Sequence, residues 1–457
     1  MKSVNPFMPL FRFSLLFSCL LCATFYVEAQ EVITIQEAIN KTLSNNLQIK
    51  QSQLSESLSD ENYKQSKNAL FPSVNGGSSY NINFGRSLDP STQEFVSQKF
   101  SSFNGNLNAS VNLFQGFQKM NQIKQNKLLL EADQTNTAKV KNDLILQVIT
   151  AYLQILYNKD FLVTANQQLA VAESQLKQQQ QLLDVGNKTL ADLSQAKSQV
   201  ATAQLSVTNA ANALTISYLT LAQLMDIPSA SKYEIQAPLL ASFNNPSTQY
   251  NPDQVYDEAL KIFPDVKLAA IRTEAAKRAI EVAKGSYYPS LSFGGSLGTN
   301  YSSSRYRMIA TGMVERYPFI DQFTDNFNQA VGINLQIPIF TGYAARSGVR
   351  RARISYLQNQ TQEQLTKNNL NKVIYQAVAD LKAAESRFQS TTDTYLAQKD
   401  AYYVIEQRYE VGLVNSLDYS TAQTNLNKAE IDMIQAKYDL LFRAKVIDYY
   451  LGRQITF

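Results

Sequence analysis

The sequence contains one long internal repeat, and this repeat limits the folds that the chain can adopt. Two motifs recur at a spacing of 226 residues: LFQG at 113–116 returns as IFTG at 339–342, and DVGNKTLAD at 184–192 returns as EVGLVNSLD at 410–418. FPSVNGG, which begins at Phe71, returns as YPSLSFGG from Tyr288 at a spacing of 217, so the second half holds about nine extra residues between these motifs. Repetition at this scale predicts two structurally equivalent halves.

The repeat defines the predicted domain organisation. We expect a first repeat at 30–228 and a second at 251–457, joined by a segment at 229–250 that is rich in Pro, Ser and Asn. Each repeat should contain a helix, a β-hairpin, a long helix and a further helix, with the hairpins at 73–114 and 290–340. We call 229–250 the equatorial segment, because it falls in the middle of the predicted helical part.

The N-terminal segment has the features of a secretory signal peptide, which we place at 1–29. Basic residues precede the apolar stretch FSLLFSCLLCATFYV, and a small residue, Ala29, stands at the expected cleavage site. Cleavage there would remove Cys19 and Cys22, the two cysteines of the chain, and leave no disulfide. Two alternatives stay open: lipidation of Cys19, and retention of the segment as an anchor helix.

The composition argues against an enzyme. Histidine is absent, so a Ser/His/Asp triad, a histidine base and a histidine-ligated zinc site are excluded. The sequence shows neither an acidic pair suited to a glycosidase nor a phosphate-binding G-x-x-x-x-G-K motif. The 42 Lys and Arg barely exceed the 38 Asp and Glu and form no basic cluster interleaved with aromatic residues, which argues against nucleic-acid binding. We predict no catalysis, cofactor or metal.

Long helices are predicted in both halves. Only 16 Gly and 12 Pro occur in 457 residues, so few turns interrupt the chain. Large apolar residues recur every seven positions along 118–183 and 343–409. They are Val148, Ile155, Leu162, Leu169, Leu176 and Leu183, and the equivalent Ile374, Leu381, Phe388, Tyr395, Tyr402 and Tyr409. A sustained heptad indicates supercoiled helices, each about 100 Å long at this length.

Four shorter helices of about 35 residues complete the helical part. Thr34 and Glu37 form a capping box that begins a helix ending near Leu70. In the second half, an Asn-Pro pair at 251–252 begins a helix that ends near Ser286. The other two follow the glycine turns at the ends of the long helices. Two short helices placed end to end equal one long helix, so each chain should contribute four helical columns.

Four segments alternate between apolar and small polar residues, as half-exposed strands do. The apolar positions of the first hairpin are Val74, Tyr80, Ile82 and Phe84, then Phe103, Leu107, Val111 and Leu113. Those of the second are Leu291, Phe293, Leu297 and Tyr301, then Val331, Ile333, Leu335, Ile337 and Ile339. Asn, Ser and Gly dominate the other positions, so one face suits hydrocarbon and the other suits water. Lengths of about 10 to 12 residues match tilted transmembrane strands.

The hairpins predict an oligomer, because a four-stranded sheet has two open edges and each unpaired amide costs several kcal/mol in lipid. Two copies would give eight strands, a bore that side chains just fill, whereas three copies give twelve and leave a pore. We therefore expect a mainly α-helical chain with transmembrane β-strands. The homotrimer would form a twelve-stranded outer-membrane β-barrel, with four strands per protomer, continued by a twelve-helix α-barrel in the periplasm.

Aromatic residues gather at the ends of the strands next to the helices, where an interfacial girdle would contact outer-membrane lipid. The girdle is predicted from Phe71, Phe114, Tyr288 and Phe340. The helices leave from these ends of the strands and must occupy the periplasm. The loops at 86–102 and 302–326 would therefore be extracellular.

Taken together, these motifs resemble the outer membrane factor family typified by TolC. The motifs are ITIQEAI at 33–39, the FPS and YPS segments, LFQG and IFTG, and two VG turns that an Asp follows, and they extend over 31–457. The resemblance implies a trimeric channel that serves a tripartite efflux pump or type I secretion. It also implies two partners: a periplasmic adaptor, or membrane fusion protein, and an inner-membrane pump of the RND or ABC type.

The resemblance further implies functional residues at the two helix turns. Adaptor docking is assigned to Val185, Gly186, Val411, Gly412 and Leu413, and the gate to Asp184, Asp192, Tyr409, Glu410 and Asp418. A hydrogen bond from the Tyr409 hydroxyl to Asp192 would link the turns. Val414 stands where relatives can carry a basic partner, a role that Lys188 could take instead. Asp418 would lie near the narrowest radius, where three carboxylates repel one another and favour cations.

The sequence predicts a passive exit duct from the periplasm to the exterior, and the resemblance implies that an adaptor opens it at the helix turns. The alternative is a surface or periplasmic coiled-coil protein with a structural or adhesive role and no channel activity. The two differ in whether the hairpins lie in lipid. A wall of small polar residues selects weakly, so the sequence does not reveal the exported substrate.

Overall fold

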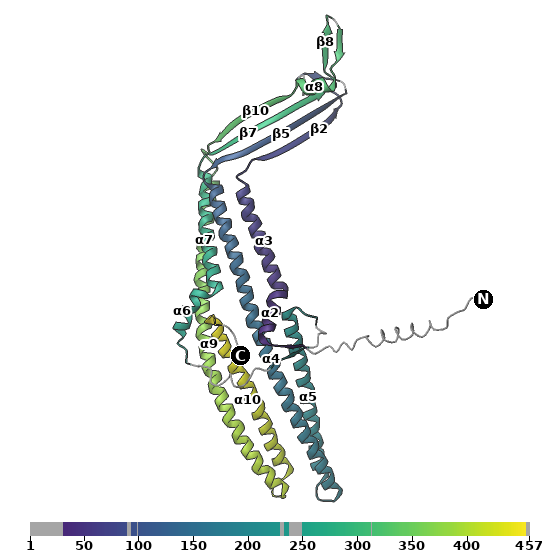
Figure 1. Cartoon of the computed structure of the whole chain (residues 1–457), viewed down its shortest axis with the longest axis vertical. Coiled ribbons are helices and arrows are strands. Elements are labelled where there is room, and N and C mark those ends of the chain that lie inside the picture. Colours follow the sequence, from purple (N-terminus) through teal and green to yellow (C-terminus); the bar gives the residue numbers. More distant parts are fainter. Residues whose placement is uncertain are drawn as a thin grey trace, which may run out of the picture.

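The computed structural model describes residues 31–88, 93–97, 99–228, 233–236, 249–311 and 313–453. The predicted signal peptide at 1–29, with Cys19 and Cys22, lies outside the described residues, and so does most of the equatorial segment. The molecule is elongated. A bundle of long helices carries a tilted β-sheet at one end, and a small hairpin extends beyond the sheet (Figure 1).

The two halves contain equivalent main helices and strands. The first half consists of β1 (Glu31–Ile33), α2 (Ile35–Asn45), α3 (Leu47–Asn68), β2 (Ser73–Asn83), β3 (Ser87–Leu88), β4 (Phe95–Val96), β5 (Phe100–Gln115), α4 (Gln118–Asp184) and α5 (Leu190–Met225), and β6 (Tyr233–Ile235) follows it. The second half consists of α6 (Pro252–Ile262), α7 (Pro264–Lys284), the 3-10 turn η2 (Gly285–Tyr287), β7 (Ser290–Ser302), β8 (Tyr306–Ala310), β9 (Met313–Arg316), α8 (Phe319–Asp325), β10 (Asn328–Gln336), α9 (Ala344–Glu410) and α10 (Ser416–Tyr450). Equivalent elements begin 217 residues apart before the sheet and 226 apart at the long helices, as the motifs do.

The first helix of each half is broken, at positions 217 residues apart. The sequence predicts an unbroken helix in both places, but the backbone leaves the helical conformation at Asn46 and at Phe263, which have ψ angles of 127° and 122°. The Asn46 side chain accepts a hydrogen bond from the backbone N–H of Gln48 at 2.9 Å and thereby caps α3. Pro264 begins α7, and a proline disfavours the helical conformation in the residue before it.

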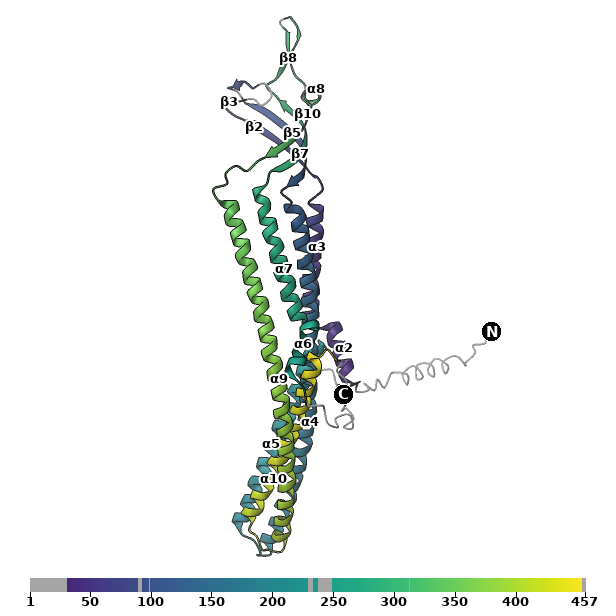
Figure 2. The ribbon, with the colours of Figure 1, turned by 90° about the vertical axis from the view of Figure 1, so that its left-hand side faces the viewer.

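The helices form four columns. In the half nearer the sheet, α3 packs against α4, α4 against α7, and α7 against α9; in the other half, α4 packs against α5 and α10, and α10 against α9. α3 therefore stands above α5, and α7 above α10, beside the uninterrupted α4 and α9 (Figures 1 and 2). With 67 residues each, α4 and α9 confirm the two predicted long helices. In the part of the chain that the structure describes, none of the helices combines the length and the apolar character of a membrane span.

The best-buried part of the helical bundle lies near its middle. Val148, Ile155, Ile374 and Leu381, four of the predicted heptad positions, are fully buried. The later heptad positions, which approach the turns, are only half-buried. The supercoiled packing is therefore tight at the middle of the bundle and looser toward its tip.

Tyr152 of α4 holds the small parallel sheet of β1 and β6 against the bundle. Its buried hydroxyl donates to the backbone oxygen of Gln236 at 2.6 Å and lies 3.1 Å from that of Ile33. The N-terminal strand is thereby tied to α4 and to the segment that connects the two halves.

The four long strands form one antiparallel sheet in the order β10-β7-β5-β2. Two rows of the apolar face are Tyr80-Phe103-Tyr301 and Val111-Phe293-Ile333, and one row of the polar face is Asn75-Asn108-Ser296. The register therefore confirms the predicted separation of apolar from polar positions. β2 and β10 form the edges, and among the described residues each pairs with one strand.

Three strand and loop boundaries differ from the predicted ones. β10 ends at Gln336 rather than at 340, because Pro338 lacks the N–H group that a strand needs for pairing. β5 begins at Phe100, inside the loop predicted at 86–102. The loop predicted at 302–326 contains β8, β9 and α8.

The corners between the sheet and the long helices each place two consecutive residues in the left-handed conformation. Gly116 and Phe117 have φ angles of 54° and 59° before α4, and Gly342 and Tyr343 have 56° and 63° before α9. The two corners differ in their surroundings. A Cβ atom at Gly116 would lie 2.4 Å from the carbonyl oxygen of Gly285, whereas one at Gly342 would have no atom within 4 Å.

Candidate functional site

The two helix turns at the end of the bundle far from the sheet share one backbone conformation (Figure 1). After α4, Gly186 and Asn187 donate their backbone N–H groups to carbonyl oxygens of the last helical turn at 2.9 and 2.8 Å. Gly412 and Leu413 make the equivalent bonds after α9 at 3.0 and 2.8 Å. This is the Schellman motif, and both glycines have the φ angle of 78° that it requires.

The residues assigned to adaptor docking lie on the outer surface of these turns. The side chains of Val185, Val411 and Leu413 are 68%, 70% and 70% exposed, and Leu190 and Leu417, at the start of α5 and α10, are exposed to a similar extent. A group of uncovered apolar side chains at an accessible end of a molecule is typical of a surface that binds another protein.

Asp192 joins the first turn to the second. It completes a capping box with Thr189, whose hydroxyl donates to the carboxylate at 2.7 Å. Ser416, the first residue of α10, donates its hydroxyl to the other carboxylate oxygen. The hydrogen bonds from Ser416 and then Thr189 lower the pKa of Asp192 to about 2. The carboxylate is therefore ionised at neutral pH and holds the start of α5 against the start of α10.

Tyr409 makes a different set of contacts. Its ring stacks on that of Tyr419 with centroids 4.5 Å apart, and the ammonium group of Lys188 lies 4.7 Å from its centroid. Among the described residues, the Asp192 carboxylate is hydrogen-bonded to Thr189 and Ser416, and no hydrogen bond joins it to Tyr409. Lys188 supplies the cation at this site, and its contact with an aromatic face links the two turns.

Tyr419 lies in a polar cluster that sequence reasoning missed. Its hydroxyl is 2.6 Å from that of Tyr402 and accepts a hydrogen bond from the side-chain amide of Gln175 on α4. Tyr402 also donates to a carboxylate oxygen of Glu406 at 2.9 Å. Burial and the contact with Tyr419 raise the pKa of Tyr402, so its hydroxyl stays protonated. The heptad pattern indicated that Tyr402 packs against a neighbouring helix, but not that its hydroxyl meets that of Tyr419.

The other acidic residues assigned to the gate face solvent. Asp184, Glu410 and Asp418 are exposed. Asp418 is the repeat equivalent of Asp192, and its backbone N–H donates to the Asn415 side chain at 2.8 Å. Among the described residues, no hydrogen bond or ion pair joins the Asp418 carboxylate to the first turn. Of these two equivalent carboxylates, that of Asp192 is hydrogen-bonded to the other turn, and that of Asp418, among the described residues, is not.

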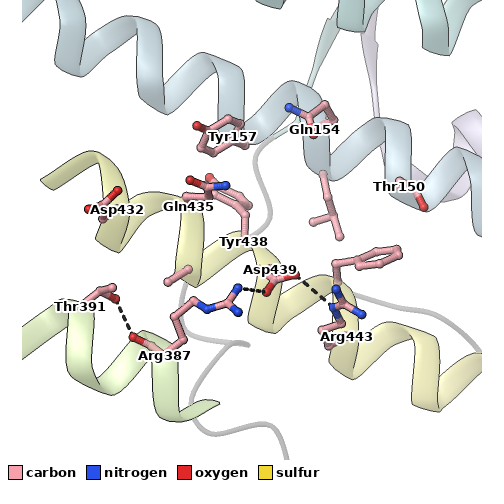
Figure 3. Close-up of a pocket in the computed structure, with 13 residues that line it drawn as sticks. Thr150, Gln154, Tyr157, Arg387, Thr391, Asp432, Gln435, Tyr438, Asp439 and Arg443 are labelled. Atoms are coloured by element: carbon pink, nitrogen blue, oxygen red, sulfur yellow. Dashed lines mark hydrogen bonds and ion pairs between the residues drawn. The ribbon is translucent and has the colours of Figure 1, made fainter. Parts of the chain in front are cut away.

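Nearer the middle of the bundle, a further hydrogen bond joins the two helical hairpins, α4–α5 and α9–α10. A groove of about 540 Å³ lies between α4, α9 and α10 (Figure 3). Within it, Asp439 accepts hydrogen bonds from Arg387 at 3.3 Å and from Arg443 at 3.1 Å. Tyr438 of α10 donates its hydroxyl to Asp160 of α4 at 2.7 Å. The hairpins are therefore tied at two levels, at this groove and at the turns.

The residues predicted for the aromatic girdle lie at the junction of sheet and helices. Phe71, Tyr288 and Phe340 are exposed, and Phe114 is half-buried. Phe114 and Phe340 each make an edge-to-face pair with the aromatic residue of the following corner, with ring centroids 5.2 and 5.7 Å apart. The predicted girdle residues therefore gather at the helical end of the sheet, most of them exposed.

A long bundle with paired helix turns at one end and an amphipathic four-stranded sheet at the other defines the TolC-like outer-membrane channel fold. The family profile described as outer membrane efflux protein matches residues 38–226 and 255–453, and the chain belongs to this family of channels. Its location is accordingly the outer membrane of a Gram-negative bacterium.

Similar proteins support the same assignment. The chain is 24% identical to the outer membrane efflux protein BepC of Brucella suis, over 92% of this chain and 85% of BepC. It is 22% identical to the outer membrane protein TolC of Vibrio cholerae, over 92% of this chain and 90% of TolC. Among solved structures, the CmeC outer membrane channel of Campylobacter jejuni superposes with a TM-score of 0.76 at 17% identity, over 92% of this chain and 85% of CmeC.

Proposed function

We propose that the chain forms a homotrimeric exit duct that carries substrates passively from the periplasm to the exterior as part of a tripartite efflux pump or a type I secretion system. The sheet is the observation that carries this proposal. It has one apolar face, one face of Asn, Ser and Gly, and two unpaired edges within the described chain. A sheet of this kind suits a wall between lipid and water.

Closure by three copies accounts for the edges. Unpaired strand edges are unfavourable in lipid, and pairing β10 of one copy with β2 of the next would satisfy them. Twelve strands leave a bore that side chains do not fill, lined here by the polar rows. Four helical columns per copy would give twelve, so an α-barrel would continue the β-barrel into the periplasm.

We place the gate and the docking surface at the helix turns. Asp192 with Ser416, and Lys188 with Tyr409, tie the two hairpins of one copy together at the tip. An adaptor that binds the exposed Val185, Val411 and Leu413 would pull the hairpins apart and widen the mouth. The sequence carries no phosphate-binding motif, so we assign the energy source to an inner-membrane pump of the RND or ABC type.

Channel activity is tested with purified protein in planar bilayers. We expect discrete conductance steps, and a trimer that keeps its mobility on gels when the sample is not boiled. A soluble monomer without conductance would refute the proposal and favour the coiled-coil adhesion protein instead.

The gate is tested by comparing two variants at equivalent turns. Ser416→Ala removes one half-buried hydrogen bond to Asp192 in each copy, which is worth about 0.5 to 1 kcal/mol. Three copies lose about 1.5 to 3 kcal/mol, so the ratio of open to closed channels should rise about 10- to 100-fold. Asp418→Ala is the control: it should lower cation preference and leave that ratio unchanged. Opening by Asp418→Ala alone would contradict this assignment of the gate.

A further inference from the structure

The short helix α8 packs on the apolar face of the sheet, at the strand ends far from the long helices (Figure 1). The Phe319 ring makes edge-to-face contacts with Phe103 and Tyr301, with centroids 5.9 and 5.0 Å away. Phe103 and Tyr301 are paired residues of one apolar row. Thr299, on the same face of β7, donates its hydroxyl to the carbonyl oxygen of Phe323 at 2.7 Å. α8 thus covers the outward end of the face that the proposed function places in lipid.

A buried glutamine fixes α8 to β7. Gln322 is fully buried, and its side-chain oxygen accepts from the backbone N–H of Ser302 at 3.0 Å. Its amide donates to the backbone oxygens of Ser302 at 2.9 Å and Tyr317 at 2.8 Å. Such bonds are costly to break when the polar groups are buried, as Gln322 is. α8 is therefore a fixed part of the sheet rather than a loosely attached loop.

Apolar side chains of α8, and of the segment that joins it to β10, remain uncovered, including part of the Phe319 ring that contacts the sheet. Ile320 is 69% exposed, and the side chains of Phe319, Phe323 and Phe327 are also exposed. These four large side chains fall within nine consecutive residues. A concentrated apolar patch of this kind marks a surface that meets lipid or another protein.

Beside α8, the apolar rows give way to aromatic and then to charged side chains, and the β8–β9 hairpin beyond them again exposes apolar residues such as Met308 and Val314. The apolar rows lead to the aromatic residues of α8, and the guanidinium groups of Arg305 and Arg307 then lie 5.1 and 5.5 Å from the centroid of the Tyr317 ring. Arg307 is also paired with Asp321 of α8 at 2.7 Å. A sequence from apolar through aromatic to charged groups matches the polarity of a membrane interface.

The position of α8 on the sheet indicates whether its apolar side chains contact lipid or a second copy of the chain. α8 makes ring contacts with β5 and β7, which are the two inner strands. A neighbouring copy would join at the edges, β2 and β10, and would leave the side chains of α8 over the inner strands uncovered. Lipid is therefore the partner that fits.

We propose, on the basis of the proposed function, that α8 is an interfacial anchor in the outer leaflet. Ile320, Phe323 and Phe327 lie at the boundary between head groups and acyl chains, about 5 to 10 Å deep, as amphipathic interfacial helices do. Because Gln322 fixes α8 to β7, this contact sets the depth of the barrel in the membrane. The aromatic girdle at the other end of the strands sets the opposite limit.

The chain contains no tryptophan, so a single introduced one reports its own surroundings. Ile320→Trp is placed at an exposed position and is reconstituted in phosphatidylcholine vesicles whose acyl chains are brominated either near the head group or near the chain end. We expect stronger quenching by the shallow bromine atoms and protection from iodide in the water. Quenching by iodide without quenching by bromine would overturn the proposal. Phe323→Trp repeats the test if Ile320→Trp folds poorly.

Two further variants separate the failure of this inference from the failure of the proposed function. Phe293→Trp replaces one aromatic residue by another on the apolar face of β7 and should be quenched by the bromine atoms. Val185→Trp, at a helix turn, should be quenched by iodide. If Phe293→Trp escapes bromine, the membrane barrel itself is wrong. If Phe293→Trp is quenched and Ile320→Trp is exposed to iodide, the barrel stands and the anchor is wrong.

Discussion

The two corners between sheet and helices offer a matched test of the packing described above. Gly116→Ala and Gly342→Ala each force an alanine into the left-handed conformation, at φ angles of 54° and 56°, which costs about 1 to 2 kcal/mol in both cases. At position 116 the new methyl group would also lie 2.4 Å from the backbone oxygen of Gly285, an atom that no side-chain rotation can move. Overpacking of this kind adds about 1 to 3 kcal/mol. We therefore expect Gly116→Ala to lower the free energy of unfolding by about 2 to 5 kcal/mol and Gly342→Ala by about 1 to 2.

The measurement is urea-induced unfolding of each variant in detergent micelles, followed by the change in gel mobility of unboiled samples. Both variants carry the same chemical change at equivalent positions of the repeat, so an effect on the unfolded chain cancels between them. Equal unfolding midpoints for the two variants would refute the reasoning, because the contact of the first corner with Gly285 would then contribute nothing.

Three other predictions concern stability and pH. Tyr152→Phe leaves the backbone oxygen of Gln236 without its hydrogen-bond donor at 2.6 Å and should lower the free energy of unfolding by about 1 to 3 kcal/mol. An unchanged unfolding midpoint in urea would contradict this prediction. Leu381→Ala, at a fully buried site of α9, should lower the free energy of unfolding by about 2 to 5 kcal/mol. Leu357→Ala, at an exposed site of the same helix, should lower it by about 0.5 kcal/mol or less. Similar losses in the two variants would show that the burial of these residues is misassigned. The folded state lowers the pKa of Asp192 from 3.8 to about 2, so its link to Ser416 is complete above pH 3.8 and is lost as pH falls through about 2. In single-channel recordings, titration of Asp192 should therefore leave the open fraction unchanged above pH 3.8, and a change caused by this carboxylate in that range would contradict the assignment.

The sheet could be predicted almost completely because its signal is local. Alternation of side chains along one strand already states which residues share a face, and in β5 and β7 that alternation is nearly unbroken. The break at Asn46 was missed for the opposite reason. Its side-chain amide donates to the backbone oxygen of Leu224 at 2.9 Å, a residue 178 positions away, and no pattern around Asn46 reveals that contact.

The candidate site could likewise be predicted only where its structure depends on local sequence. The glycine turns could be predicted because a Schellman motif depends on the residues of one helix end. Contacts between the turns depend on how α4, α5, α9 and α10 rotate about one another, which the heptads specify only coarsely. Ser416 was therefore missed as the partner of Asp192, and α8 was missed because Gln322 and Ser302 meet only in the folded chain.

The equivalent turns share a backbone but not their side chains, since Asn187 occupies the place that Leu413 has in the second. In the proposed trimer the mouth would have sixfold symmetry for its main chain and threefold symmetry for its surface chemistry. A ligand that recognises only the backbone shape would find six equivalent binding sites around the ring. A ligand that recognises side chains would find two kinds of site, three of each, in alternation. Binding stoichiometry at the mouth would thus report which of the two the ligand recognises.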